Sequence, residues 1–330
     1  MKISDIGERE LVRRIKSLCN NGRGEDIIEG IGDDCAAYTP TPGFLQVVTI
    51  DALVEKSHFH FDYFPPKLLG RKAISVNLSD IAAMGAIPKY ALVSLQLPKD
   101  FSLADIESLY EGMMEAASFY KLSIVGGNLT SSALFSIHIS MIGEVAKDRL
   151  VSRGGGRVGD AIYVTGTIGD ASAGHEIVSS KKTSAEYPFL RGVYLNPSAK
   201  GIEGKLLADN YIASAMIDLS DGLASDLRQI TEASGVGALI KEGLLPPSEE
   251  LRKYASETGK NILDYQLYGG EDYQLLFTVP AAKEGELKKM IKGGLIEATK
   301  IGKIVKGEGV SLLGKDGKLV PLPNSGFSHF

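Results

Sequence analysis

The sequence has few cysteines, no strongly basic segment and no long apolar run. Its two cysteines, Cys19 and Cys35, are too few for a disulfide framework and indicate a reducing compartment. Lys and Arg number 36 against 41 Asp and Glu, a net charge of −5, so a basic nucleic-acid-binding face is not expected. No run approaches the roughly 18 apolar residues of a membrane span, and the N-terminus lacks a signal-peptide core. We therefore expect a cytoplasmic protein with neither nucleic acid nor membrane as a partner.

Several familiar catalytic motifs are also missing. The sequence contains neither Gly-x-Ser-x-Gly nor His-Glu-x-x-His. Gly154, Gly156 and Gly159 match Gly-x-Gly-x-x-Gly, but a predicted strand follows them, whereas the dinucleotide fingerprint needs a strand before and a helix after. Residues 309–316 come close to a P-loop but end in Asp, and Asp316-Gly317 predicts a hairpin turn. We therefore expect no dinucleotide fingerprint, no P-loop and no protein-kinase signature.

The length and the hydrophobic pattern predict two domains. A chain of 330 residues with 44% hydrophobic content can give each of two domains a core. Glycine and charge at 147–160 place the boundary between residues 1–148 and 149–330. Strands and helices mix without a strict βαβ rhythm, which favours an α+β fold. Helices are predicted at 1–20, 68–84 and 103–120, and strands at 44–54, 90–97, 123–125, 135–145, 161–165, 215–219 and 274–279.

Acidic residues stand beside glycines and inside apolar segments, where an aspartate is rarely found without a partner. The Asp33-Asp34 pair follows two glycines, Asp51 lies within a predicted strand, and Asp80 interrupts an apolar helix. Alternation along the strand puts Asp51 on the same face as Thr49. Two further acids, Asp218 and Asp221, occupy a predicted strand-to-helix junction.

Each acid has a plain structural interpretation. The Asp33-Asp34 pair could form a turn, Asp51 could pair with an arginine, Asp80 could be a structural hydrogen-bonding acid, and Ser220 could be a helix N-cap. As a group they favour a cation, because carboxylates about 5 Å apart repel by about 3 kcal/mol per pair at an effective dielectric constant near 20. Oxygen ligands without Cys/His spacing favour Mg²⁺ over Zn²⁺.

Two glycine-rich segments add features of a nucleotide site. Gly126-Gly127-Asn128 follows a predicted strand. Residues 152–157 bring two arginines beside backbone amides, an arrangement suited to phosphate, although a flexible domain linker is the alternative. His58 and His60 could point into a site or lie on the surface. Glu271 and Asp272 follow paired glycines and are most simply a tight turn.

Taken in order, a series of motifs resembles the thiamine-monophosphate kinases and spans nearly the whole chain. The resemblance implies the two-domain fold of the aminoimidazole-ribonucleotide-synthetase-like superfamily. Its N-terminal domain would bind ATP and Mg²⁺ and dimerise through a mixed or antiparallel sheet, and its C-terminal α/β domain would complete the nucleotide and substrate cleft. The motifs are Gly30–Asp34, Thr49–Asp51, His58–Phe59, Val76–Ala86, Gly126–Asn128, Ser152–Arg153, Ile217–Gly222, Gly269–Tyr273 and Gly326–Phe327.

The same resemblance implies Mg²⁺-dependent, in-line transfer of the ATP γ-phosphate to thiamine phosphate, giving thiamine diphosphate and ADP, by a homodimer. It also implies roles for individual residues. Several Mg²⁺ ions would be held by Asp34, Thr49, Ile50 through its main chain, Asp51, Asp80, Asn128, Asp218 and Asp221. ATP would be contacted by Tyr110, Gly127, Asn128, Arg153 and Ser220. Thiamine phosphate would be bound by His58, Glu271 and Phe327. The transfer itself would depend on Arg153, Asp51 and Asp221.

Two positions depart from the family pattern, which has Asp where this chain has Asn128 and Thr where it has Ile50. The implied chemistry still fits the residues. A phosphate monoester has its second pKa near about 6, so the acceptor oxygen is already mostly ionised at neutral pH and needs no general base. Catalysis then consists of aligning two anionic phosphates and neutralising their repulsion with Mg²⁺ and arginine.

Two alternatives remain. One is another ATP-dependent synthetase of the superfamily. The member of the superfamily that activates selenium should carry a reactive cysteine in an N-terminal glycine-rich loop, whereas Cys19 lies in a predicted helix. The member that acts in hydrogenase maturation should end in cysteine, whereas this sequence ends in Phe330. The other is a catalytically impaired nucleotide-binding regulatory protein, suggested by Asn128. Formation of thiamine diphosphate would separate all three.

Overall fold

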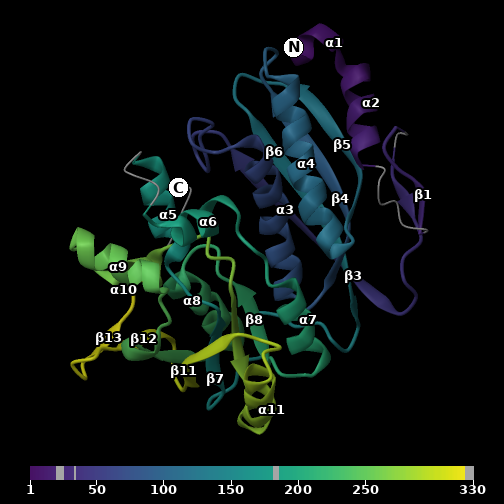
Figure 1. The fold of residues 1–330 in the computed structure, drawn as a ribbon. Helices are drawn as coiled ribbons and strands as arrows, with labels where there is room; N and C mark the ends of the chain where they lie inside the picture. The colour runs from purple at the N-terminus through teal and green to yellow at the C-terminus, as the bar shows by residue number, and fades with distance from the viewer. Residues whose placement is uncertain (20–25, 33–34, 181–185, 324–330) are drawn as a thin grey trace. The chain divides into compact units, whose positions relative to one another are not determined.

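The computed structural model describes residues 1–19, 26–32, 35–180 and 186–323 (Figure 1). The chain divides into two compact units, which are described one at a time: unit 1 comprises residues 1–81 and 86–147, and unit 2 comprises residues 82–85 and 148–330. Within the described ranges, no helix has the length and apolar character needed to cross a membrane.

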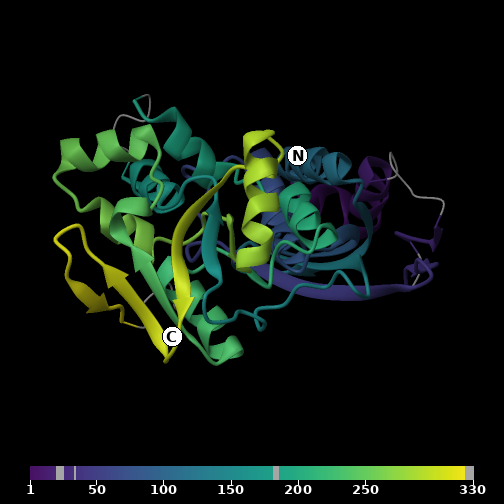
Figure 2. The same cartoon turned by 90° about the horizontal axis from the view of Figure 1, so that it is seen from below.

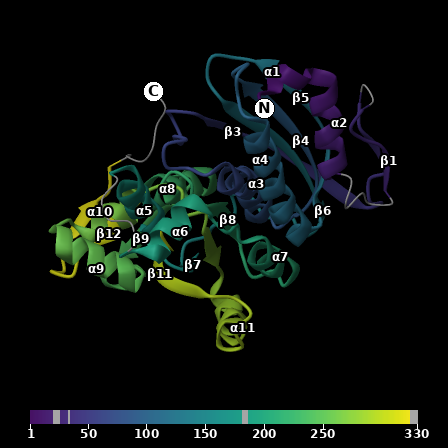
Figure 3. The same cartoon turned by 45° about the horizontal axis from the view of Figure 1, so that its top comes forward.

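Unit 1 is built on a mixed sheet with the strand order β3-β6-β4-β5. β4 and β5 run parallel, while β6 is antiparallel to both β3 and β4. Helices α3 and α4 lie side by side over the sheet (Figures 1 and 3). The elements of unit 1 are α1 (Ile3–Ile6), α2 (Glu8–Cys19), β1 (Ile27–Glu29), β2 (Ala37–Tyr38), β3 (Phe44–Val54), α3 (Pro66–Ala83), β4 (Ile87–Leu97), α4 (Leu103–Tyr120), β5 (Ser123–Ser131) and β6 (Ser136–Ala146).

The two sheet-covering helices approach closely because each has a glycine at the contact. A Cβ on Gly70 of α3 would lie 2.0 Å from the carbonyl oxygen of Leu109, and one on Gly112 of α4 would lie 1.9 Å from that of Lys67. Any side chain at either position would push the helices apart. This packing holds α3, and with it Asp80, firmly in place.

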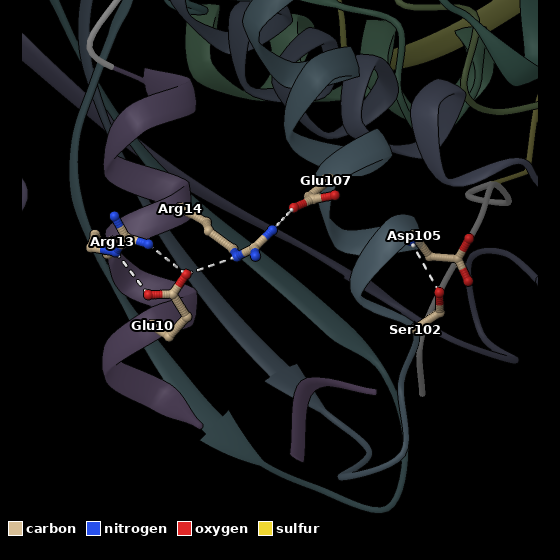
Figure 4. Close-up of polar contacts among 6 residues, drawn as sticks. All are labelled: Glu10, Arg13, Arg14, Ser102, Asp105 and Glu107. Carbon is tan, nitrogen blue, oxygen red and sulfur yellow. Dashed lines mark hydrogen bonds and ion pairs between the residues drawn. The ribbon is translucent and has the colours of Figure 1, made fainter. Parts of the chain in front are cut away.

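Polar contacts join α2 to α4 in the same unit. The guanidinium of Arg14 donates to Glu10 within α2 and, over 2.7 Å, to Glu107 of α4 (Figure 4). Helix α4 begins at Ser102, whose hydroxyl accepts a hydrogen bond from the backbone N–H of Asp105. Such N-caps satisfy a donor that the first helical turn leaves unpaired.

Unit 2 contains a second sheet, with the order β13-β12-β9-β11-β7-β10-β8, in which β9 and β12 pair in parallel. Apolar side chains of α8 and α10 pack on one set of strand residues, including Ile162 and Ile217, and those of α7 and α11 pack on the alternate set, including Tyr163 and Phe277. The sheet is therefore covered on both faces by helices (Figures 1 and 2). The strands are β7 (Ala161–Thr165), β8 (Ala215–Asp218), β9 (Gly237–Lys241), β10 (Leu275–Val279), β11 (Ala298–Val305), β12 (Gly309–Leu313) and β13 (Leu319–Pro321). The helices are α5 (Asp170–Ser179), α6 (Pro188–Leu195), α7 (Gly201–Asp209), α8 (Leu223–Ser234), the short 3₁₀ helix η1 (Glu242–Leu244), α9 (Glu249–Thr258), α10 (Ile262–Tyr268) and α11 (Ala281–Lys292).

The predicted α+β class is confirmed, and most predicted elements are present. The strand predicted at 44–54 is β3, with the same limits. The first predicted helix is interrupted at Gly7, whose φ of +78° separates α1 from α2. The hairpin turn predicted at Asp316-Gly317 joins β12 to β13, and Gly317 has a φ of +80°.

One strand is longer than predicted. β5 continues from the predicted segment 123–125 through Gly126, Gly127 and Asn128 to Ser131. A register shift at Val125 marks a bulge, after which Gly127 pairs with Val93. A Cβ on Gly127 would lie 1.9 Å from the carbonyl oxygen of Val93, so the glycine permits close strand pairing. The glycine-rich segment 126–128, predicted to follow the strand, is therefore part of it.

Candidate functional site

In unit 1, Asp51 and Asp80 come from different elements on the same side of the sheet. Thr49 and Asp51 share one face of β3, about 7 Å apart along the strand. The hydroxyl of Thr49 donates a 2.5 Å hydrogen bond to Oδ2 of Asp80 in α3. The bond shows that this face of β3 is the face that α3 covers. Thr49 and Asp80 are therefore in contact, and Asp51 lies on the same face of β3 as Thr49.

The hydrogen bond agrees with the structural interpretation of Asp80 without excluding the functional one. An ionised carboxylate has about four acceptor positions, and the Thr49 hydroxyl uses one of them. The bond fixes the orientation of the Asp80 side chain, which is half-buried. The side chain of Ile50 lies on the opposite face of β3 and is 65% exposed, so only its main chain belongs with this group.

Asn128 lies on exposed β5, where its Nδ2 donates to the Thr130 hydroxyl over 2.9 Å. The preceding Gly127 is exposed on the same strand, where it pairs with Val93. Gly127 and Asn128, which have predicted nucleotide and metal roles, thus lie on strand β5 of unit 1.

His58 follows β3 and is held by local contacts. Its Nδ1 accepts a hydrogen bond from the backbone N–H of Val54 over 3.0 Å. The next residue, Phe59, is buried and packs edge-on against Phe135, with ring centroids 5.9 Å apart. This packing anchors the turn that carries His58. His60 instead accepts from the backbone N–H two residues later, as a surface turn residue does.

Tyr110 is in the core of unit 1. It is 2% exposed, and burial, with a smaller contribution from nearby Cys19, raises the pKa of its hydroxyl. The structure therefore does not present the Tyr110 side chain to solvent, where a nucleotide would meet it. Two other predicted site residues, Asp34 and Phe327, lie outside the described residues.

In unit 2, two motifs that are far apart in the sequence pair through their backbones. The N–H of Glu271 donates to the carbonyl of Ser220, and the N–H of Tyr273 donates to that of Leu219, both over 2.8 Å. Glu271 adopts a φ of +67°, which is unusual for a residue with a side chain. The segment 269–273 is therefore hydrogen-bonded to the segment 218–222, which we call the β8–α8 loop. The structure has no turn at 269–273, so the prediction of a tight turn was wrong.

The β8–α8 loop carries Asp218, Ser220 and Asp221, and a further acid secures it. Oδ2 of Asp226 accepts hydrogen bonds from the backbone N–H groups of Asp221 and Gly222, over 3.2 and 3.1 Å. Helix α8 begins after Gly222, so the interpretation of Ser220 as its N-cap was wrong. Asp226, in the first turns of α8, instead accepts from the loop that precedes the helix.

Asp226 was not predicted as a site residue. It is fully buried, and desolvation, followed by the negative charges of Asp218 and Asp221, raises its pKa to about 8. The negative charges of Asp218 and Asp221 therefore oppose ionisation of the buried Asp226, an effect that a bound cation would relieve. In the sequence, Asp226 is an acid among apolar helix positions, next to Leu227. That pattern is also typical of an ordinary helical residue, so it does not indicate a site.

The glycine loop that carries Arg153 is packed against its own unit. The backbone N–H groups of Gly155 and Gly156 donate to the Ser234 hydroxyl over 3.2 and 3.1 Å. A Cβ on Gly155 would lie 2.3 Å from the carbonyl oxygen of Ser214. The amides of Gly155 and Gly156 are therefore already hydrogen-bonded within unit 2, and Gly155 permits close packing against Ser214. The Arg153 side chain itself is exposed and donates to Oε1 of Gln229 over 2.5 Å.

Asp272 has an internal role in unit 2. Its carboxylate accepts from the backbone N–H groups of Gly169 and Ala171, over 2.5 and 3.0 Å, at the start of α5. Burial raises its pKa to about 8, while these hydrogen bonds act in the opposite direction. Asp272 thus anchors the segment that also presents Glu271.

The donor types fit Mg²⁺, which takes carboxylate, amide and hydroxyl oxygens. Among the residues that the structure describes, no three His, Cys, Asp or Glu side chains converge as a ready metal cage. This agrees with the usual behaviour of Mg²⁺, which one or two carboxylates hold together with substrate phosphates and water. The feature that favours a cation most directly is the placement of Asp218 and Asp221 in one loop beside the buried Asp226.

Comparison with known proteins gives full-length matches. Residues 32–145 match the family model "AIR synthase related protein, N-terminal domain", and residues 157–315 match "AIR synthase related protein, C-terminal domain". The thiamine-monophosphate kinase of Aquifex aeolicus is 38% identical over 333 residues, covering 100% of both chains. The crystal structure of thiamine-monophosphate kinase from Stenotrophomonas maltophilia has a TM-score of 0.83 at 33% identity, covering 93% of this chain and 96% of that one. AaThiL complexed with AMPPCP and TMP has a TM-score of 0.79 at 36% identity, covering 100% of this chain and 99% of that one.

Proposed function

Because the chain belongs to the thiamine-monophosphate kinase family of AIR synthase related proteins, we propose that it transfers the γ-phosphoryl group of ATP to thiamine phosphate, giving ADP and thiamine diphosphate. The observation that carries the proposal is the full-length similarity to AaThiL, which was solved with AMPPCP and TMP together. A nucleotide analogue and a phosphate ester in one complex are what a phosphoryl transfer between them requires.

The proposal assigns Mg²⁺ binding to oxygen ligands in both units. In unit 1 these are Asp51 and Asp80, oriented by the Thr49 hydroxyl. In unit 2 they are Asp218 and Asp221 of the β8–α8 loop, whose negative charges act on the buried Asp226 and would be offset by bound Mg²⁺. When bound, Mg²⁺ neutralises phosphate charge and stabilises the charge that develops during transfer. Asn128, the main chain of Ile50, and Asp34 complete the proposed ligand set.

The nucleotide phosphates are assigned to Arg153, Ser220, Gly127 and Asn128. Arg153 is exposed and carries a planar guanidinium that can donate two hydrogen bonds to one phosphate. No nucleotide contact is assigned to Tyr110, because its side chain is buried. Arginine and the β8–α8 loop thus supply the charge-neutralising and orienting groups that the reaction needs.

Thiamine phosphate is assigned to His58, Glu271 and Phe327. Because Nδ1 of His58 accepts from the Val54 backbone, the neutral ring carries its proton on Nε2, a donor suited to a phosphate oxygen. Glu271 has a left-handed backbone conformation, and its N–H donates to the carbonyl of Ser220. This bond would couple substrate binding at Glu271 to the β8–α8 loop. Phe327 would pack on the cationic thiazolium ring.

The chemistry needs no general base in this assignment. The acceptor phosphate monoester is mostly ionised at neutral pH, because its second pKa is near about 6. What remains is to bring two anionic groups into line and to offset their repulsion. That task matches the residues present, which are carboxylates for Mg²⁺ and an arginine, better than it matches a proton-transfer site.

We also include homodimerisation in the proposal, through the face of the unit 1 sheet opposite α3. Val48 and Ile50 of β3 are 70% and 65% exposed there, and Leu92 of β4 is 39% exposed. Ile50 and Leu92 both pair with Ser140, so they lie in one cross-strand row. An exposed apolar patch of this kind indicates an interface.

Ile50→Lys should convert the dimer to a monomer in analytical ultracentrifugation, while Lys99→Glu, at an exposed position beyond the end of β4, should leave it dimeric.

An activity assay tests the function. Incubation with ATP, Mg²⁺ and thiamine phosphate should give thiamine diphosphate and ADP in equal amounts. ADP formation that requires a different acceptor would support another synthetase of the superfamily, and nucleotide binding without product would support a regulatory protein.

We place the reaction in the cytoplasm, since two cysteines in 330 residues fit a reducing compartment.

A further inference from the structure

A continuous set of hydrogen bonds leads from Arg153 to the β8–α8 loop within unit 2. Nη1 of Arg153 donates to Oε1 of Gln229 over 2.5 Å, and Nε2 of Gln229 donates to Oδ1 of Asp226 over 3.4 Å. Oδ2 of Asp226 then accepts from the backbone N–H groups of Asp221 and Gly222. A side chain assigned to phosphate and a loop assigned to Mg²⁺ are therefore joined through two residues of α8.

Gln229 suits this position between Arg153 and Asp226 because its side-chain amide has an oxygen that accepts and an NH₂ group that donates. The oxygen of Gln229 faces the guanidinium of Arg153, and its NH₂ group faces the carboxyl of Asp226. Gln229 and Asp226 are three residues apart in α8, a spacing that places both side chains on one face of a helix. A glutamate at this position would place a second carboxylate against Asp226, and an apolar residue would provide neither bond.

The backbone of the Arg153 loop is fixed to the same helix. Ser234, the last residue of α8, accepts from the N–H groups of Gly155 and Gly156. The loop is thus attached to α8 at two places, by its backbone near Ser234 and by the Arg153 side chain at Gln229. Without the second attachment, the arginine would sample several rotamers, and ordering it on substrate would cost conformational entropy.

We propose that Gln229 is a positioning residue for phosphoryl transfer: it fixes the Arg153 guanidinium in one orientation and ties it to the loop that carries Asp221. The inference rests on the proposed function, in which Arg153 contacts the transferred phosphate. Gln229 acts through Arg153 and has no contact of its own with substrate. Its contribution therefore concerns the alignment reached during transfer more than the affinity for ATP.

The variant Gln229→Met tests the proposal, because methionine has a similar length and removes both hydrogen bonds. We expect kcat to fall about tenfold while the KM for ATP changes less than about twofold. Glu232→Gln, at an exposed position on the same helix, is the matched control and should retain wild-type values.

The decisive comparison adds Gln229→Met to Arg153→Ala and measures single-turnover formation of thiamine diphosphate. If Gln229 acts through Arg153, the double variant should be as active as Arg153→Ala alone, within about twofold. An additional tenfold loss in the double variant, or an unchanged kcat for Gln229→Met, would overturn the proposal while wild-type turnover still upheld the function. A wild-type protein that makes no thiamine diphosphate would instead overturn the proposed function itself.

Discussion

The acids of the two units are held in different ways. In unit 1, Asp51 and Asp80 stand on a strand and a helix, and a side-chain hydroxyl joins the two elements. In unit 2, Asp221 stands on a loop whose shape depends on backbone bonds to Asp226 and to the segment 269–273. We therefore expect a substitution of an acid in unit 1 to remove one metal ligand with little further change. A substitution of an acid in unit 2 should also disturb the positions of the residues bonded to the β8–α8 loop.

The largest effect is expected from the acids of unit 1. Asp80→Asn and Asp51→Asn should each lower kcat more than about 100-fold, because each removes a charged Mg²⁺ ligand. The Tm should change little, since asparagine has nearly the same shape and its side-chain oxygen can still accept the hydrogen bond from Thr49 at position 80. Rates of thiamine diphosphate formation and thermal melts provide the two measurements. Asp100→Asn, at an exposed position of the same unit, is the control. Wild-type activity with an unchanged Mg²⁺ requirement in either variant would show that the acids are structural.

A smaller effect is expected at Arg153, where unit 2 relies on orientation. Arg153→Lys keeps the positive charge but loses the planar fork that reaches Gln229 and a phosphate together. We expect kcat to fall at least about tenfold and the KM for ATP to change less than about threefold. Steady-state kinetics with varied ATP separate the two parameters. A change in KM alone would mean that Arg153 only holds bound nucleotide.

The segment that braces the β8–α8 loop should make the stability of unit 2 depend on pH. Burial raises the pKa of Asp272 to about 8, whereas the unfolded chain titrates near about 4. Because the folded state binds this proton more tightly, the stabilisation is complete below about pH 4 and is lost as the pH rises to about 8.

Asp272→Asn removes this titration. The Tm of the wild type minus that of the variant should therefore be larger at about pH 5 than at about pH 8, by a few degrees. Thermal melts of both proteins at each pH provide the measurement. A difference that grows with pH would mean that the bonds from Gly169 and Ala171 outweigh burial and keep the carboxylate ionised.

The smallest effect is expected at Asn128, which presents an uncharged oxygen from β5. Asn128→Asp adds a charge that offsets the cost of dehydrating Mg²⁺. The Mg²⁺ concentration for half-maximal activity should fall by about two- to threefold at saturating ATP and thiamine phosphate. Thr130→Val, which removes the neighbouring hydroxyl partner, is the control for altered side-chain contacts. An unchanged or higher midpoint for Asn128→Asp would show that residue 128 does not bind the metal.

Local patterns were sufficient to predict much of unit 1. Alternation along β3 placed Thr49 and Asp51 on one face, and the apolar pattern of α3 was predicted correctly with Asp80 inside it. The extension of β5 was missed, because glycine normally disfavours strands and its use here depends on the close approach of Val93.

The organisation of unit 2 was harder to predict because it depends on contacts between distant residues. The backbone bonds between Ser220 and Glu271 leave no periodic trace in either segment. Asp226 was missed because an acid four residues into a helix gives no sign that it caps the preceding loop. Similarly, the glycines near Arg153 suggest an open loop, whereas packing against Ser214 and Ser234 makes them necessary.

The central claim is that both groups of acids serve one phosphoryl transfer. Its most direct test follows label from [γ-³²P]ATP into thiamine diphosphate with the wild type, Asp80→Asn and Asp221→Asn, using Asp209→Asn as an exposed control in unit 2. The account predicts labelled thiamine diphosphate from the wild type and the control, and a loss of more than about 100-fold in both site variants. Label that never reaches thiamine diphosphate in the wild type, or wild-type transfer by Asp221→Asn, would contradict it.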